Sequence, residues 1–241
     1  MKINDRIGTI KRLLVSTRAY QITIRLYTIV IGLLPFRGKV FLCLPRRMSG
    51  AVALTFDDGP CPETTPRILK ILAAERIRTT FFVVGREAQK QPDLIRMILD
   101  EGHSVGNHTF SHPKCKTLSR RELLAEIEKT DSVVATARPG ARAVAIRPPW
   151  GKLKLSHIII LLKQGRSLVY WSRSSYDYCS GASEVALAAE GLRSGDIFLM
   201  HNRYESTIEA LPEILQTIKR QGLTCVTIDE ALGLDDSGAA R

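Results

Sequence analysis

The stretch TFDDGP at residues 55–60 closes a run of apolar residues, AVALTF at 51–56, that predicts a short buried β-strand. The Gly-Pro pair at the end of the stretch is a stop signal. Asp57 and Asp58 are therefore expected at the carboxyl end of the strand, where α/β proteins hold their ligands. Two carboxylates there favour a division of labour in which one holds a cation and the other moves a proton. The alternative is a solvated turn, since Asp-Gly is a common turn dipeptide.

The length and composition suit one globular domain with a short extension. The chain has 241 residues, of which 44% are hydrophobic and 24% charged, so a sizeable core is possible. The net charge of +11 is uneven, because residues 1–50 hold ten Lys and Arg against one acid, whereas residues 51–241 hold 25 against 23. The nearly neutral domain argues against nucleic acid as a partner, because phosphate binding needs a basic face on the domain itself.

The cysteines do not suggest a disulfide framework. They are odd in number, scattered and without a CxxC pair: Cys43, Cys61, Cys115, Cys179 and Cys225. We expect free thiols in a reducing compartment, and hence a cytoplasmic location, although one bridge stays compatible with the pattern.

The beginning of the chain differs from the rest and predicts an extension at 1–48, a domain at 49–234 and a flexible tail at 235–241. Residues 2–18 are basic, and residues 26–36 (LYTIVIGLLPF) are mostly apolar. The apolar run is about half of the ~20 residues that a transmembrane helix needs, and no signal-peptide cleavage pattern is evident. Two interpretations stay open. The extension is a basic anchor on the anionic surface of the membrane, or it packs on the domain as an extra strand or helix.

From residue 51 onward, strand-like and helix-like stretches alternate. The strand candidates are seven runs, at 51–56, 79–84, 103–106, 143–147, 167–171, 196–200 and 223–228. The helices between them carry terminal signals: Thr65-Pro66 predicts a cap followed by a proline, and Ser119 with Glu122 predicts a capping box. Seven β units separated by helices predict an α/β fold whose parallel sheet closes, or nearly closes, into a barrel.

Two histidines follow the third strand candidate, in NHTFSH at 107–112. His108 and His112 are spaced i, i+4, so on a helical turn they face the same way and can bind one divalent ion. One carboxylate from Asp57 or Asp58 completes a His₂Asp site, whose open fourth position suits catalytic zinc. Cobalt, nickel and manganese fit the same ligands. The alternative is a pair of surface histidines at a turn.

Three later strand candidates also end in polar residues. RPPWG at 147–151 makes a rigid turn that presents the guanidinium of Arg147, able to hold a carboxylate ionised, and the backbone N–H of Trp150, able to donate to an oxyanion. Asp177 follows the fifth strand candidate, and His201 follows the sixth. A histidine at a strand end with an acid on a neighbouring loop is the usual arrangement for a general acid.

With these segments in order, residues 51–231 resemble the NodB-homology domain of polysaccharide deacetylases, carbohydrate esterase family 4. The resemblance rests on TFDDGP, HTFSH, RPPWG, the Asp177-Tyr178 element and LMH at 199–201, and the text around the first two is especially similar to chitooligosaccharide deacetylases. It implies a distorted (β/α)7-type barrel. It also implies an enzyme that removes the N-acetyl group of an N-acetylhexosamine in an oligo- or polysaccharide with the help of a metal ion.

Carried over residue by residue, the resemblance implies a metal site made by Asp58, His108 and His112. Asp57 is implied to be the general base that deprotonates the attacking water. Arg147 is implied to orient that base.

The same resemblance implies the acid and the substrate contacts. His201 is implied to protonate the leaving amine, with its charge state set by Asp177. Trp150 is implied to stabilise the oxyanion through its N–H, and Tyr178 and Leu199 to line the acetyl site.

The sequence departs from the family pattern at three positions away from the metal ligands. Tyr178 stands where Trp is usual, Ser174 where an acid is common, and Asn202 where Asp is common. These departures bear on the choice of substrate more than on the reaction. Two alternative functions stay open: a deacetylase or deformylase of a lipid-linked sugar at the membrane surface, and a non-catalytic carbohydrate-binding relative.

Overall fold

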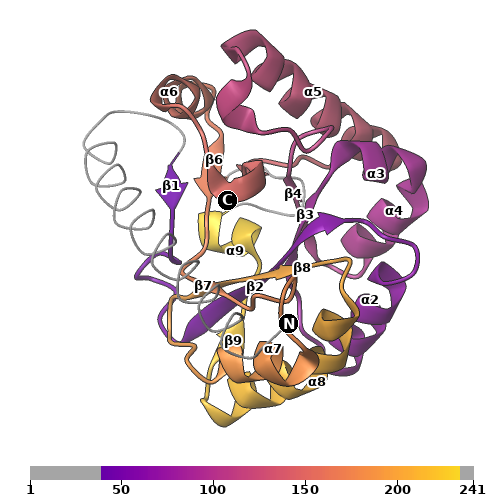
Figure 1. Ribbon diagram of the computed structural model, residues 1–241, viewed down its shortest axis with the longest axis vertical. Helices are drawn as coiled ribbons and strands as arrows, with labels where there is room; N and C mark the ends of the chain where they lie inside the picture. The colour runs from indigo at the N-terminus through magenta and orange to yellow at the C-terminus, as the bar shows by residue number, and fades with distance from the viewer. Residues whose placement is uncertain (1–38, 234–241) are drawn as a thin grey trace, which may run out of the picture. The chain divides into compact units, whose positions relative to one another are not determined.

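The computed structural model describes residues 39–233, and the strands within them form one parallel sheet. Its strands are β1 (Val40–Phe41), β2 (Ala51–Gly59), β3 (Thr80–Val83), β4 (Ser104–Asn107), β5 (Ala145–Ile146), β6 (Ser167–Val169), β7 (Arg173–Ser174), β8 (Ile197–His201) and β9 (Thr224–Cys225). They are ordered β1-β6-β5-β4-β3-β2-β8-β7, and β9 pairs with β2. The sheet curls into an incomplete barrel (Figure 1), so the predicted distorted (β/α)7-type barrel is confirmed.

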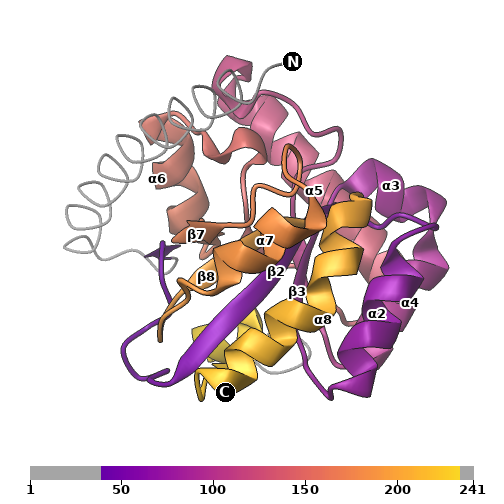
Figure 2. The same ribbon diagram turned by 60° about the horizontal axis from the view of Figure 1, so that its bottom comes forward.

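Helices connect most of the successive strands and lie on the outer face of the sheet (Figure 1), except α9, whose Ile228 and Ala231 pack with side chains inside the barrel. They are α2 (Thr65–Ala74), α3 (Gly85–Lys90), α4 (Pro92–Asp100), α5 (Arg120–Ala137), α6 (Leu155–Lys163), α7 (Ala182–Ala189), α8 (Glu205–Arg220) and α9 (Ile228–Leu232), with the 3₁₀ turns η1 (Cys115–Thr117) and η2 (Pro149–Gly151). Figure 2 shows α7 and α8 side by side over strands β2 and β8. The seven predicted strands correspond to β2 to β6, β8 and β9, and the two strands not predicted, β1 and β7, are only two residues long.

Strand β2 shows how the sequence builds two layers at once. Val52, Leu54 and Phe56 join the apolar cluster under the helices, whereas Ala53 joins a smaller cluster inside the barrel. Each large apolar side chain stabilises the fold by about 1.5–3 kcal/mol on burial. Asp57 continues the interior half of this alternation, so folding of the apolar strand carries a carboxylate into the barrel.

Two predicted helix starts have different outcomes. The capping box at α5 is confirmed, since Ser119 accepts the N–H of Glu122 and the Glu122 side chain accepts the N–H of Ser119. The predicted cap at Thr65 is wrong, because α2 already begins at that residue. Its hydroxyl instead accepts the N–H of Cys61 at 2.8 Å and the side chain of Asn202 at 2.9 Å, and so holds the turn after β2.

Part of the predicted N-terminal extension packs on the barrel. Val40 and Phe41 form β1 and pair with β6, and the side chain of Leu44 is buried in the inner cluster. Residues 1–38, on which the membrane-anchor interpretation rests, and the predicted tail at 235–241 lie outside the described residues. No helix between residues 39 and 233 is long and apolar enough to cross a membrane.

All five cysteines lie within the described part of the chain, and none of them forms a disulfide there. Burial raises the pKa of Cys115 and of Cys225 to about 12, so these two thiols are poor nucleophiles at neutral pH.

Candidate active site

The two aspartates lie in the last residues of β2, at the carboxyl ends of the strands. The sheet register places Asp57 beside His201 of β8, and the pairing of β2 with β3 becomes irregular between Asp57 and Gly59. Asp58 has a φ of 72°, in the left-handed region. Successive side chains of a regular strand point to opposite faces, but here both carboxylates come within 4 Å of one ring: His108 Nε2 lies 3.8 Å from Asp57 and 3.5 Å from Asp58.

Arg147 fixes one oxygen of Asp57. The guanidinium is fully buried, and its Nη1 donates to Asp57 Oδ1 at 2.7 Å and to Thr55 Oγ1 at 2.8 Å. Its Nε and Nη2 donate to the backbone oxygens of Val169 and Tyr170 at 3.1 and 3.0 Å. Burial lowers the pKa of Arg147, and the attraction of Asp57 offsets part of that effect. Because four acceptors hold the guanidinium, it fixes the position of Asp57 through Oδ1 and leaves the second oxygen of that carboxylate without a bond to the arginine.

The two histidines come together, but not on a helix. Their ring centroids lie 5.1 Å apart, while residues 108–112 form an irregular loop after β4. Thr109 and His112 have φ values of 65° and 57°, which a helical turn excludes. The predicted helical turn is therefore wrong, although the pair that it predicted exists. Two left-handed residues bring the rings together instead.

Side chains that the sequence did not single out hold this loop. Glu126 of α5 accepts the backbone N–H groups of Phe110 and Ser111 at 3.0 and 2.7 Å. Asn107 accepts the N–H of Thr109 at 2.9 Å through its side-chain oxygen. Charged hydrogen bonds to backbone N–H groups are stronger than neutral ones, so α5 determines where the histidines lie.

Asp58, His108 and His112 meet the requirements of a divalent metal. One ligand atom from each lies within 4.8 Å of the other two. Nδ1 of His108 lies 2.7 Å from the carbonyl oxygen of Arg147, which can only accept, so the neutral ring carries its proton on Nδ1 and turns the lone pair of Nε2 toward Asp58. Asp58 Oδ1 is buried without a hydrogen-bond partner in the described part of the chain. The lone pairs of Asp58 Oδ1 and His108 Nε2 face one another and repel unless a cation lies between them. These residues therefore fit a divalent metal ion.

The charge state of Asp58 agrees with this role. Burial on its own would raise the pKa of the carboxyl group, but His108 and His112 outweigh burial and hold the pKa well below its usual range. Asp58 Oδ1 lies 3.1 Å from His112 Nε2. Asp58 is therefore ionised at neutral pH, as a metal ligand must be.

His201 and Asp177, which the sequence predicted to act together, are in contact. Nδ1 of His201 lies 2.7 Å from Asp177 Oδ1, while Asp177 Oδ2 accepts the N–H of His201 and the hydroxyl of Thr207, both at 2.6 Å. Burial would lower the pKa of His201, but the hydrogen bond to Asp177 outweighs it and the pKa is raised. The imidazole thus keeps its proton to higher pH and can donate it from Nε2.

The three predicted substrate residues differ in exposure. Trp150 is 64% exposed and has a φ of 59°, and its ring lies 5.8 Å from that of His112. Tyr178 is 40% exposed, with its ring edge-on to His201 at 5.7 Å. Leu199 is buried in β8 on the interior face of the strand, the face that also carries His201. Two aromatic rings exposed beside the site offer stacking surfaces for a sugar.

Two residues after β8 were not predicted as part of the site. The ring of Tyr204 lies edge-on to the ring of His201, with 5.7 Å between the ring centroids. Arg203 donates to the backbone oxygen of Asp58 at 3.0 Å. Neither belongs to a motif with a spacing of its own, so only their position directly after His201 could have indicated them.

Asn202, one of the three departures from the family pattern, does not face a substrate. Its side chain is fully buried and donates to Thr65, and its N–H donates to the backbone oxygen of Asp57 at 2.8 Å. A Cβ at Gly59 would lie only 2.1 Å from Asn202 Nδ2, so glycine is required there. Asn202 therefore holds the turn after β2.

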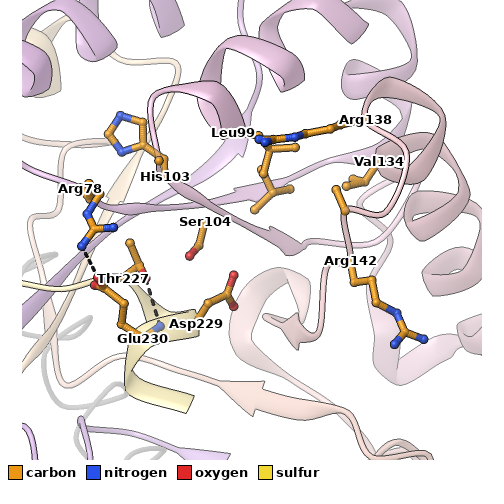
Figure 3. Close-up of a pocket in the computed structure, with 13 residues that line it drawn as sticks. Arg78, Leu99, His103, Ser104, Val134, Arg138, Arg142, Thr227, Asp229 and Glu230 are labelled. Atoms are coloured by element: carbon orange, nitrogen blue, oxygen red, sulfur yellow. Dashed lines mark hydrogen bonds and ion pairs between the residues drawn. The ribbon is translucent and has the colours of Figure 1, made fainter. Parts of the chain in front are cut away.

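A cavity at the amino ends of β3 and β4 is separate from these residues (Figure 3). Its volume is about 60 Å³, enough for a few water molecules but not for a sugar ring. Arg78 pairs with Glu230 and Arg138 with Asp100, which satisfies two of the cations around it. The cavity lies beneath α9 and has no residue in common with the candidate site.

Known proteins with similar sequences are polysaccharide and oligosaccharide deacetylases. The family model described as polysaccharide deacetylase matches residues 46–167. The chain is 34% identical to the peptidoglycan-N-acetylglucosamine deacetylase PgdA of Listeria monocytogenes, over 83% of this chain but only 42% of that protein. It is 35% identical to a chitooligosaccharide deacetylase of Sinorhizobium fredii, over 66% of this chain and 76% of that protein.

Solved structures show the same architecture. A peptidoglycan N-acetylglucosamine deacetylase, Bc1960, superimposes with a TM-score of 0.77 and 29% identity, covering 81% of this chain and 92% of that chain. A pseudoenzyme of the same family from Bacillus anthracis superimposes with a TM-score of 0.74 and 28% identity, covering 82% of this chain and 69% of that chain. With a family match over half of its length and a relative at 35% identity, the chain belongs to the polysaccharide deacetylase family, carbohydrate esterase family 4.

Proposed function

We propose that this protein is a metal-dependent N-deacetylase that hydrolyses the N-acetyl group of N-acetylhexosamine residues in an oligo- or polysaccharide. The observation that carries the proposal is the different environment of two adjacent carboxylates: a buried arginine holds Asp57, and two histidines face Asp58. Hydrolysis of an amide needs a cation and a proton acceptor side by side. Relatives named as deacetylases of chitooligosaccharides and of peptidoglycan support this choice of substrate.

The first half of the reaction uses the β2 carboxylates. Asp58, His108 and His112 would hold a divalent cation, which when bound would polarise a carbonyl group and make water more acidic. Asp57 takes a proton from the attacking water through the oxygen that Arg147 leaves free, while the water oxygen bonds to the acetyl carbon. The backbone N–H of Trp150 donates to the oxygen on which negative charge develops.

The second half uses the β8 histidine. The carbon–nitrogen bond breaks only if the nitrogen receives a proton, because an amine anion is a very poor leaving group. His201 donates that proton from Nε2, and Asp177 stabilises the protonated ring through Nδ1. The products are acetate and the free amine of the sugar.

A non-catalytic sugar-binding protein is the competing function, because one structural neighbour is a pseudoenzyme. A binding module has no use for a buried arginine on Asp57 or for an acid pair at His201. All of these groups are in place here, and they favour catalysis.

Acetate release from N-acetylglucosamine oligomers tests the proposal, using metal-free protein with and without added Zn²⁺. We expect release that depends on the metal and saturates near one ion per chain. Metal binding without release would point to a different acyl group or sugar. If the protein neither binds the metal nor releases acetate, the non-catalytic function is supported instead.

A further inference from the structure

Beyond the residues already assigned, the loops at the carboxyl ends of the strands carry more cationic than anionic side chains. These loops span 60–64, 108–118, 148–154, 175–181 and 202–204. Apart from the site residues, the charged side chains on them are Glu63, Lys114, Lys116, Lys152, Lys154 and Arg203. With Asp177, which lies on the same loops, five cations stand against two acids there, whereas residues 51–241 as a whole hold 25 cations against 23 acids. These loops therefore carry a net positive charge beside the candidate site.

Most of these cations are not engaged by the protein itself. Lys114, Lys116 and Lys152 are exposed, and none of them has an acid within salt-bridge distance among residues 39–233. Lys114 lies two residues after His112, and Lys152 lies two residues after Trp150. Surface lysines are commonly solvated and paired loosely with acids, but the two acids on these loops, Glu63 and Asp177, form no salt bridge with the three lysines.

Arg203 connects this charge to the reacting centre. Its Nη2 donates to the backbone oxygen of Asp58 at 3.0 Å, and its Nε lies 3.7 Å from Asp58 Oδ2. The side chain is nevertheless 47% exposed. Two contacts hold the guanidinium beside the metal ligands, and the side chain stays accessible to solvent. A guanidinium in this position binds a carboxylate or a phosphate through two parallel hydrogen bonds.

We propose that the site prefers N-acetylated glycans that carry an anionic oxygen group, and that Arg203 binds that group near the acetamido nitrogen while the lysines attract the glycan. This proposal rests on the proposed deacetylase function and names its substrate class. A carboxylate on the glycan and a phosphate ester offer the same chemistry to Arg203. The cationic loops raise the local concentration of such substrates, an effect that salt screens.

The test compares matched substrates that differ only in charge. An N-acetylglucosamine-containing oligosaccharide with carboxylate substituents is compared with the same oligosaccharide converted to carboxamides, and with a phosphate-bearing analogue. Wild-type protein loaded with Zn²⁺ should show kcat/KM at least about tenfold higher for the anionic form, the discrimination expected of one charge-assisted hydrogen bond. The preference should shrink as salt is raised. A higher kcat/KM for the phosphate-bearing analogue than for the carboxylate form would identify phosphate as the preferred anionic group.

Substitutions of Arg203 test whether this residue causes the preference for anionic substrates. Arg203→Gln should reduce the ratio of kcat/KM between the anionic and the neutral form about tenfold, and Arg203→Lys should restore it only in part, because lysine keeps the charge but not the planar fork. Lys70→Gln, which removes an exposed cation from α2, is the control and should leave the ratio unchanged. The Zn²⁺ affinity of Arg203→Gln should not fall, since the substitution removes a positive charge beside the site.

Two outcomes would overturn the proposal: equal kcat/KM for the charged and the neutral form in wild-type protein, or a preference that Arg203→Gln leaves intact. Dissociation constants of both oligosaccharides for the Asp57→Asn protein test the same preference without turnover. If no acetate is released but the anionic form still binds more tightly, the deacetylase function fails and the charge preference stands. Equal dissociation constants would contradict the preference independently of any activity.

Discussion

At the scale of single residues, the site depends on making two neighbouring carboxylates unlike each other. Asp57 follows the alternation of β2 into the barrel and meets a buried arginine, while Asp58 leaves the alternation through a φ of 72° and meets two histidines. A non-glycine residue in the left-handed region costs of order 1–3 kcal/mol, which the surrounding fold must offset. Local strain thus lets adjacent residues of one strand serve different chemical roles.

Asp177→Asn tests the role of His201 as an acid. The alkaline limb of the pH profile of kcat/KM reports loss of the His201 proton, and Asp177 raises that pKa. Activity is therefore kept below the raised pKa and lost as pH rises through it. Removing the carboxylate should move the limb to lower pH by about one to three units.

Glu63→Gln is the matched control for this shift. It also removes an acid from the same end of the barrel, but Glu63 is exposed and screened by water. Its alkaline limb should coincide with that of the wild type. An unmoved limb in Asp177→Asn would mean that another group is the acid.

At the scale of elements, helix α5 positions the metal ligands without touching a metal. Glu126 holds the backbone of the loop between the two histidines. Glu126→Ala should weaken Zn²⁺ binding by about 10–100-fold, the usual effect of losing a group that orients metal ligands. Isothermal titration calorimetry measures the change.

Glu128→Ala removes a neighbouring carboxylate from the solvent-exposed side of the same helix. This substitution changes the charge of α5 by the same amount as Glu126→Ala. It leaves the contacts between Glu126 and the histidine loop in place. Its Zn²⁺ affinity should equal that of the wild type. Equal losses in both variants would show that α5 charge, and not the Glu126 contact, matters.

The turn from β2 to α2 depends on close packing between Gly59 and Asn202. A Cβ at Gly59 would overlap the buried Asn202 amide, so Gly59→Ala should lower the free energy of unfolding by about 1–3 kcal/mol. In a double-mutant cycle with Asn202→Ala, the combined loss should be smaller than the sum of the single losses, because the substitution removes the amide at 2.1 Å and leaves only the Cβ of residue 202, at 3.0 Å. Additive losses, measured by urea denaturation, would contradict this packing.

At the scale of the whole molecule, most of the barrel and its site could be predicted because both depend on local patterns. Apolar runs with polar ends define strands such as β2, and the parallel sheet then collects those ends at one edge. The loop at 108–112 escaped prediction, because left-handed residues other than glycine leave no sequence signal. Contacts such as that of Glu126, 16 residues from Phe110, depend on helix packing and have no local pattern.

Acid should destabilise the domain through a histidine far from the site. Burial lowers the pKa of His103 to about 4, and its Nδ1 accepts the N–H of Thr79 at 3.1 Å, which requires a neutral ring. The unfolded chain takes up this proton near pH 6.5, so stability is full above that pH and falls between about 6.5 and 4. The loss is at most about 3 kcal/mol.

Urea denaturation of metal-free protein at pH 7 and pH 4.5 measures this effect. His103→Gln removes the titration, so its free energy of unfolding should be lower at pH 7 but should fall less between the two pH values. A fall equal to that of the wild type would show that other groups cause the acid sensitivity.

The central claim is that Asp58 holds the metal while Asp57 moves the proton. Zn²⁺ binding and acetate release from N-acetylglucosamine oligomers, measured together for Asp57→Asn and Asp58→Asn, test it most directly. We predict that Asp57→Asn binds Zn²⁺ with one ion per chain but loses about 10²–10⁴-fold in kcat, whereas Asp58→Asn loses both binding and activity. Normal Zn²⁺ binding by Asp58→Asn, or substantial turnover by Asp57→Asn, would contradict the division of roles.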